Sequence, residues 1–267
     1  MSTVETFRQL HADTTPLRLP NAWDAGSARL FESAGATAIA TTSGGVAWAL
    51  GYRDGGVLPL SELVGVVARM ARVVTVPLSI DIENGYSDDP KIVADNVMRL
   101  VDLGIAGINI EDGEDKPSLL ASRIDAIRKA TARAGVDLFV NARCDVFLRN
   151  LVASSELVGE SIARGNLYAE AGADGLFLPG LQQPDQIRAI VNDVSLPLNL
   201  MVWPELADAE ALGKLGVRRL SAGTSIAQVA WETAERLARD FLKNGGSAPM
   251  YKGFVPYAQL QELFPGK

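Results

Sequence analysis

Short runs of apolar residues alternate with longer amphipathic stretches along the chain, and this alternation restricts the possible folds more than any other feature of the sequence. It is typical of repeated βα units around a parallel sheet, whose strands are buried on both faces. We predict eight strands, at residues 17–21, 36–41, 77–81, 107–110, 138–142, 175–178, 196–200 and 218–221. The sequence therefore predicts an α/β fold, a (β/α)8 TIM barrel.

The length of the chain fits one such barrel. It has 267 residues, and no linker or low-complexity tract divides it, so we expect a single domain over residues 1–267. The last helix is predicted over residues 222–244, and residues 245–267 form a C-terminal tail that begins with a helix-breaking Gly-Gly-Ser-Ala-Pro. Apolar side chains at 257–264 need a partner surface, so this helical extension is expected to pack across a neighbouring subunit.

The composition excludes several classes of partner. A formal net charge of −7 argues against nucleic-acid and membrane-surface binding, which require clustered Lys and Arg. A small diffusible substrate is expected instead. The single cysteine, Cys144, rules out an internal disulfide, and no N-terminal apolar segment resembles a signal peptide or a membrane span. We therefore expect a cytoplasmic protein.

Acidic residues follow two of the predicted strands. Asp81 and Glu83 come after one strand, and Glu111 and Asp112 come after the next. Carboxylates at the C-terminal ends of barrel strands suit a divalent cation such as Mg²⁺, although a single acidic residue could also serve as a helix N-cap. Asp81 and Glu83 lie two positions apart, so they face the same side of an extended segment and would repel each other without a cation.

Six segments in fixed order carry a family resemblance. With them the chain resembles the isocitrate lyase and phosphoenolpyruvate mutase superfamily. The segments are Asn21-Ala22-Trp23-Asp24-Ala25-Gly26-Ser27-Ala28, Thr41-Thr42-Ser43-Gly44-Gly45, Arg53-Asp54, Asp81-Ile82-Glu83-Asn84-Gly85-Tyr86, Gly107-Ile108-Asn109-Ile110-Glu111-Asp112 and Ala142-Arg143-Cys144-Asp145.

The resemblance implies a metal site. Asp81 would be the direct ligand of Mg²⁺, with Mn²⁺ as a possible replacement. Asp54, Glu83 and Glu111 would hold the waters on the metal, which agrees with the reluctance of Mg²⁺ to lose its waters. Asp112 could join them.

The resemblance also implies a substrate site in which Asp81 takes part through the metal. Ser43, Gly44 and Gly45 would form a loop that grips a substrate carboxylate, with a simple tight turn as the alternative. Arg143 would bind the α-keto acid part, with a structural ion pair to Asp145 or Glu111 as the alternative. Trp23 would pack on the keto acid, unless it serves core packing alone. Asn199 occupies what looks like a matching substrate position.

Differences from the sequences of the family narrow the range of possible substrates. The lyases for isocitrate and methylisocitrate carry a Lys-[Lys/Arg]-Cys-Gly-His loop, whereas residues 113–119 here contain neither cysteine nor histidine. Cys144 follows Arg143 on another strand and is interpreted as a small buried thiol. Those lyases also hold a third carboxylate with a Glu and a Thr, where this chain has Pro179-Gly180 and Met201. We therefore expect weak or no isocitrate lyase activity.

The activity implied is that of a Mg²⁺-dependent carbon–carbon lyase acting on a small α-keto or 2-hydroxy di-acid through an enolate, like an oxaloacetate decarboxylase or hydrolase. Phosphonopyruvate hydrolase or mutase chemistry, 2-methylisocitrate or isocitrate lysis, and non-catalytic binding of a keto acid are the alternatives. The selecting residues are expected on a loop at 113–122 and in the tail. A homodimer or homotetramer is implied. The candidate catalytic residues are Arg143, Asp54, Glu111 and Ser118.

Overall fold

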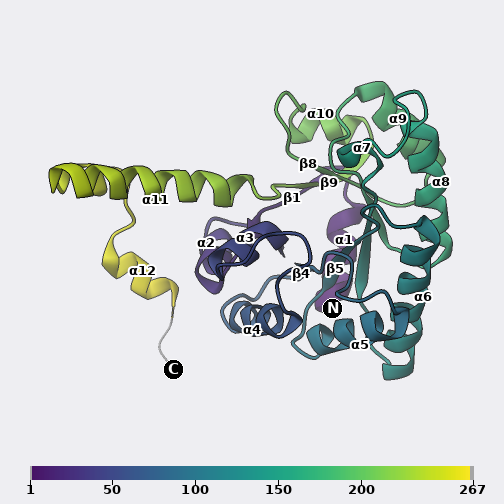
Figure 1. The fold of residues 1–267 in the computed structure, drawn as a ribbon, viewed down its shortest axis with the longest axis horizontal. Coiled ribbons are helices and arrows are strands. Elements are labelled where there is room, and N and C mark those ends of the chain that lie inside the picture. Colours follow the sequence, from purple (N-terminus) through teal and green to yellow (C-terminus); the bar gives the residue numbers. More distant parts are fainter. Residues whose placement is uncertain (1, 265–267) are drawn as a thin grey trace.

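The strands form one parallel sheet that closes on itself almost completely (Figure 1). The computed structural model describes residues 2–264. The sheet order is β1-β9-β8-β7-β6-β5-β4-β3-β2, and every pairing is parallel. The predicted α/β barrel is confirmed. The strands are β1 Leu17–Leu19, β2 Asn21–Ala22, β3 Ile39–Thr41, β4 Leu78–Asp81, β5 Gly107–Glu111, β6 Phe139–Arg143, β7 Gly175–Phe177, β8 Leu198–Met201 and β9 Val217–Ser221.

The first strand departs from the prediction. Residues 17–21 were expected to form one continuous strand, but Pro20 divides it into β1 and β2. Proline has no N–H to donate, so a continuous ladder with both neighbours is impossible at this position. The chain changes partner there: β1 pairs with β9, β2 pairs with β3, and the Pro20 carbonyl accepts the Ala40 N–H at 3.1 Å. The two halves of this strand thereby join the edges of the sheet.

Helices cover the outside of the barrel, and α1 lies at its amino end. Phe7 of α1 is fully buried and meets Phe139, the first residue of β6, with 5.2 Å between ring centroids. The helices are α1 Thr3–Ala12, α2 Ala25–Ser33, α3 Ser43–Ala49, α4 Leu60–Ala71, α5 Pro90–Val101, α6 Pro117–Ala134, α7 Val146–Arg149, α8 Leu157–Glu170, α9 Pro184–Asp193, α10 Ala209–Lys214, α11 Ser225–Asn244, the 3-10 helix η1 Ala248–Tyr251 and α12 Tyr257–Leu263.

The last long helix leaves the barrel. Helix α11 begins at Ser225, three residues later than predicted, and projects away from the sheet (Figure 1). Only Ala227 of its residues is buried. The chain then turns back, and the Leu263 carbonyl accepts a hydrogen bond from Arg29 Nε of α2 at 2.8 Å. Residues 265–267 of the predicted tail lie outside the described part. No helix within residues 2–264 is long and apolar enough to cross a membrane.

Candidate active site

A cavity of 210 Å³ opens at the carboxyl ends of the strands, where barrel enzymes place their chemistry. Its polar lining residues include Asp81 from β4 and Arg143 from β6. Its apolar lining residues include Phe177 and Met201, and the Phe177 ring centroid lies 5.9 Å from the guanidinium carbon of Arg143. The full lining consists of Asn21, Thr42, Ser43, Asp54, Asp81, Asn109, Arg143, Leu148, Phe177, Pro179, Met201, Ser221, Gly223 and Thr224.

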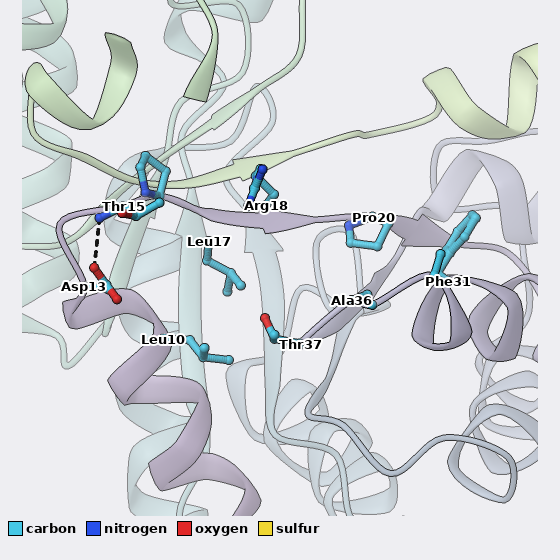
Figure 2. Close-up of a pocket in the computed structure, with 12 residues that line it drawn as sticks. Leu10, Asp13, Thr15, Leu17, Arg18, Pro20, Phe31, Ala36 and Thr37 are labelled. Atoms are coloured by element: carbon cyan, nitrogen blue, oxygen red, sulfur yellow. Dashed lines mark hydrogen bonds between the residues drawn. The ribbon is translucent and has the colours of Figure 1, made fainter. Parts of the chain in front are cut away.

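A larger hollow of 480 Å³ lies at the other end of the barrel (Figure 2). It is formed by the end of α1, strand β1 and the turn between α2 and β3. Figure 2 shows Arg18 and Asp13 at its edge, with Asp13 accepting the Thr15 N–H at 3.0 Å. The amino end of a barrel serves stability, so size alone does not make this hollow the active site.

Arg143 is held as a fixed fork at the end of β6. Its Nε donates to Asp145 Oδ1 at 2.6 Å and its Nη2 donates to Asp145 Oδ2 at 3.0 Å. Its Nη1 lies 2.7 Å from Glu111 Oε2. Although burial alone lowers the pKa of Arg143, the charges of Glu111 and Asp145 raise it, so the guanidinium stays charged. The structural ion pair considered for Arg143 exists, yet the same side chain also lines the cavity.

Asp81 faces the cavity from the end of β4 and is 8% exposed. Its N–H donates to Thr41 Oγ1 at 2.8 Å, and its Oδ1 accepts the Glu83 N–H at 3.1 Å. Burial raises the pKa of Asp81, and the neighbouring charge of Asp54 adds to this effect. The site therefore holds more negative charge at this point than its protein partners neutralise.

Glu83 and Glu111 share this excess of negative charge. Burial and the charge of Asp81 raise the pKa of Glu83 to about 7, even though Gly56 N–H donates to Glu83 Oε2. Burial also raises the pKa of Glu111, against the opposing effect of Arg143. Carboxylates that are difficult to ionise together are a sign that a cation belongs among them.

The arrangement of these carboxylates is compatible with the predicted Mg²⁺ site only if a single carboxylate ligates the ion directly. Among residues 2–264, no three carboxylate, imidazole or thiol groups lie close enough to ligate one ion directly. Asp54, Asp81, Glu83 and Glu111 are thus not brought together as a direct ligand set. They remain coupled through their charges, as the raised pKa values of Asp81 and Glu83 indicate. This suits Mg²⁺ held by one carboxylate and by waters that the other carboxylates bind.

Comparison with known proteins identifies the family of the chain. A family described as Phosphoenolpyruvate phosphomutase matches residues 7–242, which is most of the chain. The chain belongs to the phosphoenolpyruvate mutase/isocitrate lyase superfamily. It is 36% identical to an uncharacterized protein of Mycobacterium tuberculosis, over 96% of this chain and 95% of that protein.

Two further proteins are similar to this chain. The chain is 31% identical to an oxaloacetate decarboxylase of Bradyrhizobium sp., over 79% of this chain and 74% of that enzyme. The crystal structure of a Burkholderia cenocepacia protein provisionally named a phosphonomutase has a TM-score of 0.84 and 39% identity, over 89% of this chain and 99% of that one. The superfamily typically uses Mg²⁺.

The resemblance implied that Ser43, Gly44 and Gly45 form a loop. In the structure these residues form the first turn of α3. Ser43 lines the cavity. Both glycines are tightly enclosed: a Cβ on Gly44 would lie 3.1 Å from Asp54 Oδ2, and one on Gly45 would lie 2.6 Å from Thr42 Cγ2. Side chains at these two positions would displace the residues that form the cavity wall, which explains the need for glycine.

Seven of the predicted residues are not part of the cavity lining: Gly44, Gly45, Glu83, Glu111, Trp23, Asn199 and Ser118. Glu83 and Glu111 line a separate hollow. Trp23 packs edge-on against Phe31, with 6.0 Å between ring centroids, as expected for core packing. Asn199 is buried below the cavity, where Ser221 Oγ donates to its Oδ1 at 3.4 Å. Ser118 is exposed in the first turn of α6. The predicted loop at 113–122 is shorter than expected, because Pro117 begins that helix, so a catalytic role for Ser118 stays a prediction.

Asp112 was expected to join the carboxylates around the metal, but its side chain is engaged elsewhere. Its Oδ2 accepts hydrogen bonds from Tyr168 Oη at 2.6 Å and Arg164 Nη1 at 2.9 Å. Its Oδ1 accepts the Asp145 N–H at 2.9 Å. Asp112 therefore supports the segment that carries Asp145, which in turn fixes Arg143. Cys144 is buried and free, as predicted.

Several lining residues were missed by the sequence analysis. Asn109 and Asn21 are polar residues in short strands that also contain apolar residues, a signal that could have identified them. Ser221 ends β9, which also contains Arg218 and Arg219, so its signal is weaker. Leu148 and Phe177 carry no such signal, because apolar residues near strand ends are common. Pro179 and Met201, identified as departures from the family, do line the cavity.

The raised pKa of Glu83 predicts how Mg²⁺ affinity depends on pH. A carboxyl with a pKa of about 7 is mostly protonated at pH 6 and mostly ionised at pH 8, and only the ionised form attracts the cation. Calorimetric titration should therefore give roughly tenfold tighter Mg²⁺ binding at pH 8 than at pH 6. Glu83→Gln should weaken binding at pH 8 and reduce this difference. Equal affinity at both pH values would contradict the assignment.

Proposed function

We propose that the protein is a Mg²⁺-dependent carbon–carbon lyase acting on a small α-keto di-acid, and that decarboxylation of oxaloacetate is its best-supported reaction. The observation that carries the proposal is the mixed lining of this small cavity. Its polar residues include Arg143, Ser43 and Asp81, and its apolar residues are Leu148, Phe177, Pro179 and Met201.

The size of the cavity limits the substrate. At 210 Å³ it is smaller than the roughly 300 to 1,000 Å³ of sites for drug-sized ligands. In the proposed arrangement a di-acid places one carboxylate and its keto oxygen against Arg143 and Ser43. Pro179 and Met201 offer no polar side chain to a third carboxylate, so a tricarboxylate would bind at a cost of roughly 1 to 3 kcal/mol for each lost hydrogen bond.

The residues of the chain have distinct parts in this reaction. Asp81 would hold Mg²⁺, with Asp54, Glu83 and Glu111 binding its waters; the bound ion supplies Lewis-acid stabilisation of developing negative charge. Arg143 binds the α-keto acid part and stabilises the charge that moves there when the carbon–carbon bond breaks and CO₂ leaves. Asp145 keeps the guanidinium fork in one orientation. The electron pair of the broken carbon–carbon bond passes to the enolate as CO₂ leaves, and a proton taken from solvent then converts the enolate to pyruvate.

The relatives support decarboxylation of oxaloacetate as the reaction, and they also support a second candidate activity. The Bradyrhizobium relative is named an oxaloacetate decarboxylase. Phosphonopyruvate chemistry is the second candidate, because the Burkholderia cenocepacia relative is provisionally named a phosphonomutase and Lys116-Pro117-Ser118 partly resembles the loop of the mutases. Non-catalytic binding of a keto acid would hardly need the group of Asp54, Asp81, Glu83, Glu111 and Arg143.

Turnover tests the proposal. Pyruvate release from oxaloacetate is measured with protein and Mg²⁺, with protein and EDTA, and with Mg²⁺ alone, since the free ion also decarboxylates oxaloacetate slowly. We expect product formation well above the ion-only control, and only when protein and metal are both present. Tight metal-dependent binding of oxaloacetate without product would favour a binding protein instead.

We also propose that a second copy of this chain covers α11, giving a homodimer or homotetramer. Among the described residues, only Ala227 of this helix is buried. The helix presents a stripe of apolar residues at helical spacing: Ile226, Ala230, Ala234, Leu237, Ala238 and Phe241. Phe241 is 50% exposed. A 20-residue helix with this stripe is not stable alone in water, so it needs an apolar surface to pack against.

Light scattering after size-exclusion chromatography should therefore give a mass of two or four chains. Phe241→Glu should shift the protein toward the monomer, because it places a charge in the buried stripe. Lys243→Glu, on the opposite side of the helix, is the matched control and should leave the mass unchanged. A monomeric wild-type protein at micromolar concentration would contradict the proposal.

A further inference from the structure

We propose that Asn109 contacts the bound keto acid through its amide Nδ2, and that Arg219, deep in the barrel, is a positioning residue that orients this amide. The inference deepens the proposed function and rests on it for the class of ligand. Nothing in the family resemblance assigned a role to either residue.

Asn109 points to the same face of the sheet as Asp81. The register pairs Asp81 of β4 with Asn109 of β5, and Asn109 with Asn141 of β6. Residues paired across parallel strands point to the same face, so these three side chains all point into the barrel. Asn109 is 3% exposed and lines the cavity together with Asp81 and Arg143.

Two donors fix the orientation of the Asn109 amide. Its Oδ1 accepts hydrogen bonds from Arg219 Nη2 at 3.1 Å and from Asn141 Nδ2 at 2.9 Å. A guanidinium can only donate, so the oxygen of the amide must be the atom that faces Arg219. Within residues 2–264, no group accepts a hydrogen bond from Asn109 Nδ2. The amide therefore offers N–H groups to the cavity, where an oxyanion of the substrate can accept them.

Apart from Asn109, Arg219 has a cation–π contact with Phe7, with 6.0 Å between its guanidinium carbon and the ring centroid. It is fully buried in β9, and its hydrogen bond to Asn109 is its only one to a side chain within residues 2–264. Its Nε and Nη1 are buried without a partner. A buried guanidinium with a single hydrogen bond is costly, and apolar replacements of such groups are often neutral or stabilising. We attribute its presence mainly to the hydrogen bond that orients Asn109, since Arg219 itself does not line the cavity.

Binding of oxalate tests the inference without requiring turnover. Oxalate is a planar dianion whose paired oxygens match the α-keto acid part of the substrate. In calorimetry at saturating Mg²⁺, Asn109→Ala should weaken oxalate binding roughly tenfold to a hundredfold, as expected for a lost hydrogen bond to a charged group. Arg219→Met should weaken it by a smaller factor without lowering the melting temperature. Asn166→Ala, an exposed asparagine on α8, is the matched control and should bind like the wild type.

The double variant decides whether Arg219 acts through Asn109. If it does, Arg219→Met should cause no further loss of affinity in the Asn109→Ala background. Equal losses in both backgrounds would overturn the positioning role, and oxalate binding by Asn109→Ala within twofold of wild type would overturn the contact. Should Arg219→Met fail to fold, Arg219→Lys, which keeps the charge but not the fork, gives the same comparison.

Measurements of oxalate binding and of oxaloacetate turnover by the wild-type protein test this inference and the proposed function separately. Oxalate binding without turnover of oxaloacetate would remove the lyase proposal and leave the Asn109 contact standing. Failure of wild-type protein to bind oxalate with Mg²⁺ would overturn the contact, because the inference needs an oxyanion in the cavity.

Discussion

Replacing Asp81 by asparagine is expected to lower kcat/KM for oxaloacetate by at least roughly a thousandfold, because it removes the one carboxylate that would hold Mg²⁺ directly. The expected loss of activity comes from the missing negative charge and not from a change in side-chain shape. Asparagine has nearly the same shape, and its Oδ1 can still accept the Glu83 N–H that Asp81 accepts at 3.1 Å. Calorimetry should show no Mg²⁺ binding by the variant.

The stability of Asp81→Asn separates loss of the metal from loss of the fold. Because burial raises the pKa of Asp81, its ionised form destabilises the metal-free protein at neutral pH. Because the pKa is raised, the wild-type protein loses stability progressively as the pH rises and Asp81 ionises. Asparagine carries no charge, so the metal-free variant should melt at the same temperature as the metal-free wild type or at a higher one. Asp95→Asn, an exposed change on α5, is the control. Metal-dependent turnover by Asp81→Asn near the wild-type rate would refute the metal assignment.

Replacing Arg143 by lysine should lower kcat/KM by at least roughly a hundredfold, since a lysine keeps the charge but cannot form the fork that binds an α-keto acid. The loss should appear in kcat as well as in KM, because the negative charge on the keto acid increases as the bond breaks.

Arg149→Lys provides a matched control for this change. Arg149 Nε also binds Asp145, at 2.9 Å, but its side chain is not part of the cavity lining. We expect its kcat/KM to stay within a few-fold of the wild type. Equal losses in the two variants would mean that the Asp145 network, and not contact of Arg143 with substrate, determines the activity.

The fold could be predicted largely from the sequence because barrel strands are buried on both faces and therefore appear as apolar runs. The strand that contains Pro20 shows the limit of this approach. Its residues are apolar enough to suggest one strand, but the missing N–H at Pro20 and the closure of the sheet divide it in two. Closure is a long-range property, which a local pattern does not contain.

The site could be predicted in part for a similar reason. Asp81 and Arg143 end strands, so their position followed from the strand prediction. Asn109 was missed, because its role depends on which face of β5 points inward and on Arg219, which lies 110 residues further along the chain. Ser118 was expected on a loop, but the helix that starts at Pro117 places it on the exposed outer surface.

Product analysis by NMR tests the central claim most directly. The protein is incubated with Mg²⁺ and, in separate samples, oxaloacetate, phosphonopyruvate, isocitrate and 2-methylisocitrate, each with an EDTA control. We expect metal-dependent pyruvate from oxaloacetate, above the rate with Mg²⁺ alone, and no glyoxylate from either tricarboxylate. Glyoxylate from isocitrate or 2-methylisocitrate, or no product from any of the four compounds, would contradict the account.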